Sequence, residues 1–166
     1  MSDGENCPIC QGDARHEPLP NRHRIHSWTC HRCGEFALPY LGETARITPD
    51  ADGWESWHPA RLSALLRERQ LRGLPTCALL FGEHDVPPDF PIPVVTAKEL
   101  LAMWPVRFTE RLDRALCNLV RSSQHFGDEV KVTVDDPALV MAESAKEVPS
   151  ICRALEEHSL VDPIVA

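Results

Sequence analysis

Cys-Pro-Ile-Cys at residues 7–10 and Cys-His-Arg-Cys at residues 30–33 hold four of the seven cysteines of this 166-residue chain. Each stretch is a C-x-x-C loop, a spacing that lets two thiolates converge on one edge of a coordination tetrahedron. Two such loops supply the four ligands of one metal ion, and four cysteines leave its coordination sphere closed. The spacing therefore predicts one structural Zn²⁺, bound by Cys7, Cys10, Cys30 and Cys33.

The segment around these loops favours the fold known as a zinc ribbon. About forty residues with few large apolar side chains do not build a self-sufficient core, whereas structural zinc contributes ~10–16 kcal/mol of apparent binding energy to small peptides. We therefore expect the metal to replace the missing core. Short strands are expected at residues 23–29 and 36–40. Gly12 and Gly34 follow the loops and provide the backbone freedom that turns amide groups toward the sulfurs.

Other interpretations of the cysteines and histidines are weaker. A redox C-x-x-C usually accompanies a βαβ pattern, which we do not find around either loop, and a catalytic zinc keeps an open coordination position. Four histidines near the loops are alternative ligands, but with four cysteines available we interpret them as surface groups or neighbours of the ligands. They are His16, His23, His26 and His31. Cys77, Cys117 and Cys152 are interpreted as small buried hydrophobes.

The rest of the chain shows mainly helical patterns. Apolar spacing predicts an amphipathic helix at residues 59–73, and four prolines mark a connector at 82–93. Thr96 to Glu99 is a capping box for a short helix that stops before Pro105. Further elements are expected as a helix from 109 to about 125, a strand at 129–134, a helix beginning at 136–137 and a helix at 149–158.

This order of elements is that of a winged-helix domain. We therefore predict an α+β fold: a zinc ribbon (1–45), the amphipathic helix with its Pro-rich connector (46–93), and a mainly helical, winged-helix-like domain (94–166). The recognition position of the winged helix falls on residues 150–158. Glu156 and Glu157 there repel phosphate, which favours contact with protein.

Charge limits the class of partner. The net charge is −8, and only the middle of the chain is not acidic, which disfavours tight nonspecific binding of nucleic acid. The densest basic cluster is the candidate contact for nucleic acid or another partner, although such arginines more often flank an apolar stripe and pair with acids such as Glu68. It comprises Arg61, Arg67, Arg69 and Arg72. Three tryptophans near the ribbon are candidates for base stacking, but Trp28 beside Cys30 is better explained as a shield of the metal loop. The others are Trp54 and Trp57.

Membrane and enzyme classes find no support in the sequence. No apolar run approaches the ~20 residues that span a bilayer, and the N-terminus is polar and acidic, so a soluble cytoplasmic protein without membrane contact is expected. There is no Gly-x-Ser-x-Gly elbow, no phosphate-binding glycine loop and no His-Glu-x-x-His. We therefore expect no enzymatic activity and no small-molecule substrate.

Two resemblances point to a class of function. Cys-Pro-Ile-Cys-Gln-Gly (7–12) and Trp-Thr-Cys-His-Arg-Cys-Gly-Glu-Phe (28–36) resemble the loops of bacterial zinc ribbons. Arg-Leu-Ser-Ala-Leu-Leu-Arg-Glu (61–68), Val-Val-Thr (94–96) and Arg-Leu-Asp-Arg (111–114) resemble N-terminal regions of bacterial antiphage-type effectors. In those proteins a ribbon and a winged-helix-like segment precede a toxic or nucleotide-processing domain. The resemblance implies sensing, recruitment or regulation.

The sequence therefore predicts a noncatalytic, zinc-stabilised recognition or adaptor module. Its expected partner is a protein or a protein–nucleic acid assembly in a bacterial defence or regulatory system. The alternative is a DNA- or RNA-binding regulator that uses the winged helix and the helix carrying Arg61 and Arg72, for which salt-dependent binding is diagnostic. An enzyme with an unrecognised site is the third hypothesis and predicts a deep polar pocket.

Overall fold

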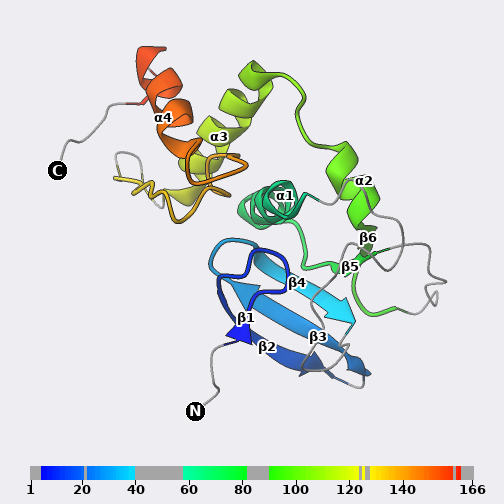
Figure 1. Cartoon of the computed structure of the whole chain (residues 1–166). Helices are drawn as coiled ribbons and strands as arrows, with labels where there is room; N and C mark the ends of the chain where they lie inside the picture. Colours follow the sequence, from blue (N-terminus) through cyan, green and yellow to red (C-terminus); the bar gives the residue numbers. More distant parts are fainter. Residues whose placement is uncertain are drawn as a thin grey trace.

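The computed structural model describes residues 5–20, 22–39, 58–81, 90–123, 125, 128–158 and 160–161. Within these ranges the chain is a mixed α+β structure with one six-stranded sheet and four helices (Figure 1). The strands lie in chain order across the sheet. They are β1 (Glu5–Asn6), β2 (Asp13–Leu19), β3 (Arg22–Cys30), β4 (Gly34–Pro39), β5 (Ala78–Leu80) and β6 (Val94–Thr96).

The first four strands form an antiparallel meander that carries the cysteine loops. β3 and β4 confirm the two expected strands and pair from Cys30 opposite Gly34 to Ile25 opposite Pro39. On the other side β3 pairs with β2, where Ala14 lies opposite Cys30. β2 was not expected, because its charged residues and Pro18 give no apolar alternation.

The other two strands come from the middle of the chain. β5 runs parallel to β4, with Ala78 opposite Ala37, and β6 runs parallel to β5, with Val95 opposite Leu79. Parallel neighbours require a crossover connection, and the helix α1 (Pro59–Leu71) lies in the chain between β4 and β5. The sheet thus continues past residue 45, and the expected domain bounds stay a prediction.

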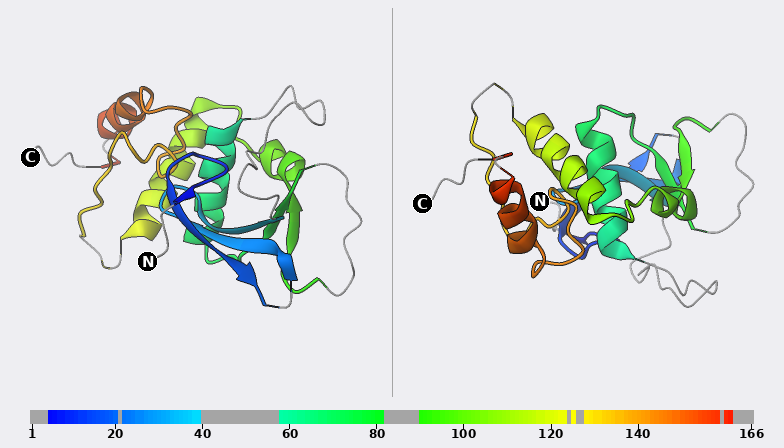
Figure 2. Two further views of the ribbon diagram at one scale, coloured as in Figure 1. Left: turned by 60° about the horizontal axis from the view of Figure 1, so that its bottom comes forward. Right: turned by 90° about the horizontal axis from the view of Figure 1, so that it is seen from above.

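Helix α1 is central to the molecule. It packs against β4, α2 and α3, and Figure 2 shows it over the sheet with α3 beside it and α4 beyond α3. Five consecutive residues, 62–66, are buried, because neighbours cover the helix on more than one side. Pro59 starts the helix with a preset φ. Gly73, at φ +69°, ends it in a Schellman motif, in which its amide donates to the Gln70 carbonyl over 2.8 Å.

Four of the five expected helices are confirmed, with corrected ends. α2 spans Ala97–Ala102, and the Thr96–Glu99 capping box has both of its hydrogen bonds. α3 spans Phe108–Ser122, so it ends earlier than the sequence suggested, and α4 spans Val148–Glu157. Among the described residues, no helix is long and apolar enough to cross a membrane.

Two expectations for the segment between α3 and α4 are wrong. Residues 129–134 form no strand, because their alternating valines have no neighbouring strand to pair with. Residues 137–142 form turns rather than a helix, and Met141, at φ +57°, departs from helical geometry. Residues 138–142 are buried nonetheless, and Asn118 of α3 donates to the Leu139 carbonyl over 3.2 Å. The winged-helix arrangement is not confirmed.

A single apolar core joins the sheet to the helices. Cys7, Ile9 and Phe36 of the leading segment belong to the same buried cluster as Leu62 and Leu65 of α1. The expectation that the metal alone replaces a missing core is therefore wrong, because α1 completes that core. The largest fully buried side chains include Phe36, Leu62, Leu65, Leu66, Leu79, Leu100, Met141, Ile151 and Leu155.

Ion pairs connect the helices around Trp104. Arg111 of α3 binds Glu143 over 3.3 Å and also binds Glu147, while Arg61 of α1 binds Glu143 over 3.0 Å. The guanidinium carbons of Arg61 and Arg111 lie 5.5 and 5.7 Å from the centroid of the Trp104 ring. The network ties α1 and α3 to the segment that leads into α4.

Candidate metal centre

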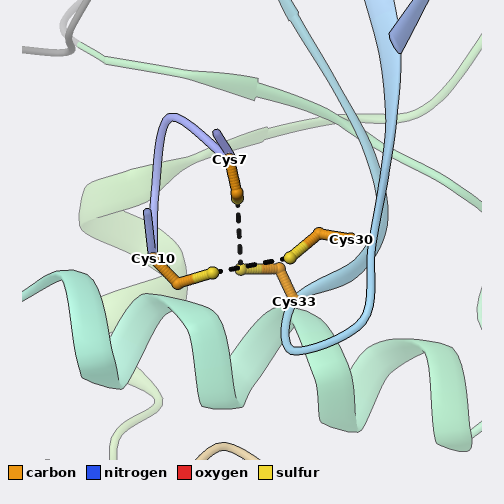
Figure 3. A group of neighbouring side chains, drawn as sticks. All are labelled: Cys7, Cys10, Cys30 and Cys33. Atoms are coloured by element: carbon orange, nitrogen blue, oxygen red, sulfur yellow. Dashed lines mark hydrogen bonds between the residues drawn. The ribbon is translucent and has the colours of Figure 1, made fainter. Parts of the chain in front are cut away.

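The sheet brings the two cysteine loops together. Cys7 and Cys10 lie in the connection from β1 to β2, Cys30 ends β3, and Cys33 immediately precedes β4. Because Cys30 lies opposite both Ala14 and Gly34, the strand register sets one loop beside the other. Figure 3 shows the four sulfur atoms facing one another next to a helix, and that helix, by its colour, is α1.

The spacing of the sulfurs fits one tetrahedral metal ion. The Sγ atoms are 3.7 Å apart for Cys7 and Cys33, and 3.4 Å apart for Cys10 and Cys30. All four lie within 4.8 Å of one another. A Zn–S bond of about 2.3 Å implies an S···S separation of about 3.8 Å in a regular tetrahedron, whereas a disulfide requires about 2.05 Å. None of the seven cysteines is in a disulfide.

Crowding of the thiols favours a cation between them. Hydrogen bonding to Cys10, and after it to Cys30, raises the pKa of Cys33 far above its usual value, while hydrogen bonding to Cys10 lowers the pKa of Cys30. Four sulfurs at these distances share protons, because ionised neighbours repel. A divalent ion removes this conflict by binding all four as thiolates.

Backbone amides support the ligands. Amide groups of Cys10, Gly12 and Cys33 hydrogen-bond to the sulfurs of Cys7, Cys10 and Cys30 respectively, and each favours the thiolate form. The pKa of Cys7 is raised nonetheless, first by hydrogen bonding to the Cys10 thiol. The residue in the left-handed region after the first loop is Gln11, at φ +60°, and not Gly12. After the second loop it is Gly34, at φ +78°. At Gly34 the expected left-handed backbone is confirmed. At Gly12 the expected amide contact with a sulfur is confirmed, without a left-handed φ.

Ser63 was not anticipated from the sequence. It lies on α1, and its Oγ is 3.2 Å from Cys33 Sγ in a buried contact. No local pattern points to position 63, because the contact depends on how α1 packs against the start of β4.

The three histidines near the loops whose side chains the structure describes do not join the cysteine group. His16 and His26 approach each other with 2.5 Å between their Nδ1 atoms, and His16 Nε2 lies 2.9 Å from Glu5. The His16 ring stacks on Trp28, which is buried. His31 Nε2 lies 3.8 Å from Asp136. Among the described residues, the four cysteines are the one group of three or more candidate ligands close enough to hold a metal ion. The His23 side chain and Trp54 and Trp57 lie outside them.

The candidate arginines are spread along α1 and the residue after it. Arg61 belongs to the network around Trp104, Arg67 donates to Gln70 Oε1 over 3.1 Å, and Arg69 donates to the Pro75 carbonyl over 3.5 Å. Arg72 is exposed. The Glu68 partner is Arg114 of α3, whose Nε is 2.9 Å from Glu68 Oε1. Contact of these arginines with nucleic acid or another partner stays a prediction.

The three other cysteines differ in exposure. Cys77 is buried, as expected, and burial raises the pKa of its thiol. Cys152 is half-buried, and burial raises its pKa as well. Cys117 lies exposed on α3, so its assignment to the core is wrong.

The second cysteine loop connects antiparallel strands. A βαβ unit, β4–α1–β5, does exist and was not recognised from the sequence. Redox C-x-x-C motifs gain reactivity at a helix N-terminus, whereas the loop at residues 30–33 precedes a strand. The placement of all four sulfurs at one point fits metal binding better than thiol exchange.

Comparisons of the chain with protein-family models, curated proteins and solved structures found no match. The cysteine cluster is consistent with a zinc ribbon. The resemblance to antiphage-type effectors stays a prediction.

Proposed function

We propose that the four cysteines bind one structural Zn²⁺ and that the chain is a noncatalytic recognition module built on this site. The observation that carries the proposal is the approach of four sulfurs to within 4.8 Å of one another. Four thiolates in a tetrahedron select zinc or iron over hard cations such as Mg²⁺ and Ca²⁺. Elemental analysis distinguishes zinc from iron.

A closed ligand set supports a structural role for the metal. Catalytic zinc uses three protein ligands and leaves the fourth position to water or substrate. Here four cysteines fill the tetrahedron, and Cys7, Cys30 and Cys33 are buried. A metal held in this way stabilises the fold and does not activate water.

An exposed apolar corner supports binding of a macromolecular partner. Met103 follows α2, Val106 lies in the connection to α3, and Phe108 is the first residue of α3. Their exposed fractions are 48%, 94% and 46%. Large apolar side chains grouped at a surface are typical of interaction sites, and aromatic and Met side chains are enriched there. We take the partner to be a protein or a protein–nucleic acid assembly. The resemblance to antiphage-type effectors supports a bacterial defence or regulatory setting.

Elemental analysis tests the metal. The chain purified without added metal is expected to contain about one zinc per chain, and Cys30→Ser to lose it, because a structural site of this kind needs all four ligands. Cys117→Ser, at an exposed cysteine outside the group, is the matched control and should retain the metal. Stoichiometric iron, disulfides among the four cysteines, or equal metal loss from the control contradicts the assignment.

Affinity purification with quantitative mass spectrometry tests recognition. The wild-type chain and Val106→Asp are compared after expression in bacteria, with zinc content measured in both. We expect a partner that the wild type retains and Val106→Asp loses, because the new carboxylate is desolvated at an apolar contact. Identical sets of retained proteins would show that this corner is not the contact surface.

A further inference from the structure

We propose that Ser63 is a positioning residue of the metal centre, whose hydroxyl donates a hydrogen bond to the Cys33 thiolate and holds that ligand on the metal. This inference rests on the proposed binding of a metal by the four cysteines. It assigns a role in that site to a residue of α1, outside the cysteine loops.

The direction of the hydrogen bond follows from the chemistry of the ligand. A thiolate bound to a metal carries no proton, so the sulfur can only accept. While Cys33 carries its proton, the thiol donates to Ser63 Oγ over 3.2 Å. Once the sulfur is a thiolate that can only accept, the Ser63 hydroxyl has the proton to give across the same contact. In the metal-bound protein Ser63 is therefore the donor of this pair.

Burial makes this hydrogen bond difficult to replace. Ser63 is 3% exposed and Cys33 is fully buried, so bulk water does not reach the contact to substitute for the hydroxyl. A buried thiolate that loses a donor bears a larger uncompensated charge. Groups that hydrogen-bond to metal ligands typically contribute 10–100-fold to metal affinity.

The position of Ser63 links the metal to the helices. Its immediate neighbour Leu62 is in the shared core, and Arg61 belongs to the network around Trp104. On the strand side, Gly34 follows Cys33 directly and lies against Gln70 of the same helix. The Gln70 side chain thus lies against the backbone at Gly34, next to Cys33, and α1 is close enough for the Ser63 hydroxyl to reach the sulfur.

Substitution of Ser63 by alanine separates this role from helix stability. Alanine has the higher helix propensity, so Ser63→Ala favours α1 while it removes only the hydroxyl. The variant is therefore expected to keep the helical content of the wild type and to lose metal affinity. Ser63→Thr keeps a hydroxyl at this position and is expected to restore affinity in part.

The experiment measures zinc affinity and a cobalt spectrum. Zinc is titrated against a chromogenic chelator in wild type, Ser63→Ala, Ser63→Thr and Ser122→Ala, the last being a matched control whose hydroxyl donates to the Asn118 carbonyl on α3. We expect Ser63→Ala to bind zinc roughly 10–100-fold more weakly and the control to match wild type. In Co²⁺-loaded protein, the sulfur-to-cobalt charge-transfer band of Ser63→Ala shifts to longer wavelength, because the sulfur donates more charge.

Each outcome has a separate meaning. A wild-type chain that binds neither zinc nor cobalt overturns the proposed metal site itself. A wild type that binds both, with a Ser63→Ala variant of equal zinc affinity and superimposable cobalt spectrum, overturns only the role of Ser63. Weaker binding by Ser122→Ala to the same extent also overturns it, because the effect is then not specific to the Cys33 contact.

Discussion

Gly34 lies at the point where the second cysteine loop becomes β4 and passes close to α1. Its φ is +78°, and a Cβ built there would lie 3.2 Å from Gln70 Cβ and closer still to the end of that side chain. Gly73 has a similar φ of +69° but open space around it. Substitution of Gly73 by alanine therefore adds backbone strain alone, whereas the same substitution at Gly34 adds backbone strain and steric overlap.

We expect Gly34→Ala to destabilise the protein more than Gly73→Ala. Left-handed backbone costs a residue with a Cβ about 1–2 kcal/mol, which both variants incur. Only Gly34→Ala also displaces the Gln70 side chain, because the new Cβ overlaps its Oε1 and presses against its Cβ. Urea unfolding of the metal-loaded variants measures the difference, and equal losses at the two positions would show that the close approach is absent.

The cysteines could be predicted from the sequence because their chemistry is local. A C-x-x-C loop orients two sulfurs by itself, so spacing alone indicated the ligands. Ser63 could not be found in this way, because its contact joins residues thirty positions apart. The exposure of Cys117 was also mispredicted, because a cysteine among leucines can face either side of a helix.

At the scale of elements, Glu147 joins the turn before α4 to α3. Burial raises the pKa of this carboxyl. The Glu143 amide and the Arg111 guanidinium together lower it by more than burial raises it, so the pKa lies below the usual value. A lowered folded-state pKa contributes stability above the unfolded-state pKa, and this contribution is lost as the pH falls through the folded-state value.

We expect Glu147→Gln to lower the free energy of unfolding at pH 7 by about 1.5 kcal/mol, the scale of a hydrogen bond to a charged group. The difference from wild type should shrink as the pH falls below about 4.3, where glutamate becomes protonated. Chemical unfolding at a series of pH values measures it. Glu156→Gln, at an exposed position on α4, is the control. A difference that does not vary with pH would contradict the assigned cause.

The ion pair between Glu68 of α1 and Arg114 of α3 is largely buried. Arg114→Met leaves the Glu68 carboxylate without its partner, and breaking a buried pair typically costs about 3–5 kcal/mol. The double variant Glu68→Gln with Arg114→Met should recover much of this loss, because no unpaired charge remains. A double-mutant cycle by chemical unfolding measures the coupling, and additive losses would show that the pair is not energetically linked.

Local signals explain which elements the sequence could predict. The four helices have caps, prolines or apolar periodicity of their own, as at Thr96 and Pro59. β5 and β6 are three residues long and exist as strands because β4 offers an edge. The valines at 130–134 show the reverse case, since a strand pattern without a partner forms no strand.

For the whole molecule, the shared core predicts that metal loss is felt beyond the cysteine loops. Removal of the metal by a chelator is expected to increase hydrogen exchange in residues 7–12 and 30–34, and also in α1, because Ser63 and Leu62 contact the same region as Cys33 and Phe36. Hydrogen-exchange mass spectrometry measures the pattern. Loss of protection confined to residues 5–39 would instead show an independent ribbon.

The parallel pairing of β4 with β5 also constrains the order of events during translation. When residues 5–39 leave the ribosome, the strand that will pair with Ala37 has not yet emerged. The nascent meander therefore presents an open edge with unsatisfied amides and carbonyls, which is a template for association with other chains. A premature stop or a proteolytic cut between the two strands accordingly does more than remove the helices, because it leaves that edge exposed permanently.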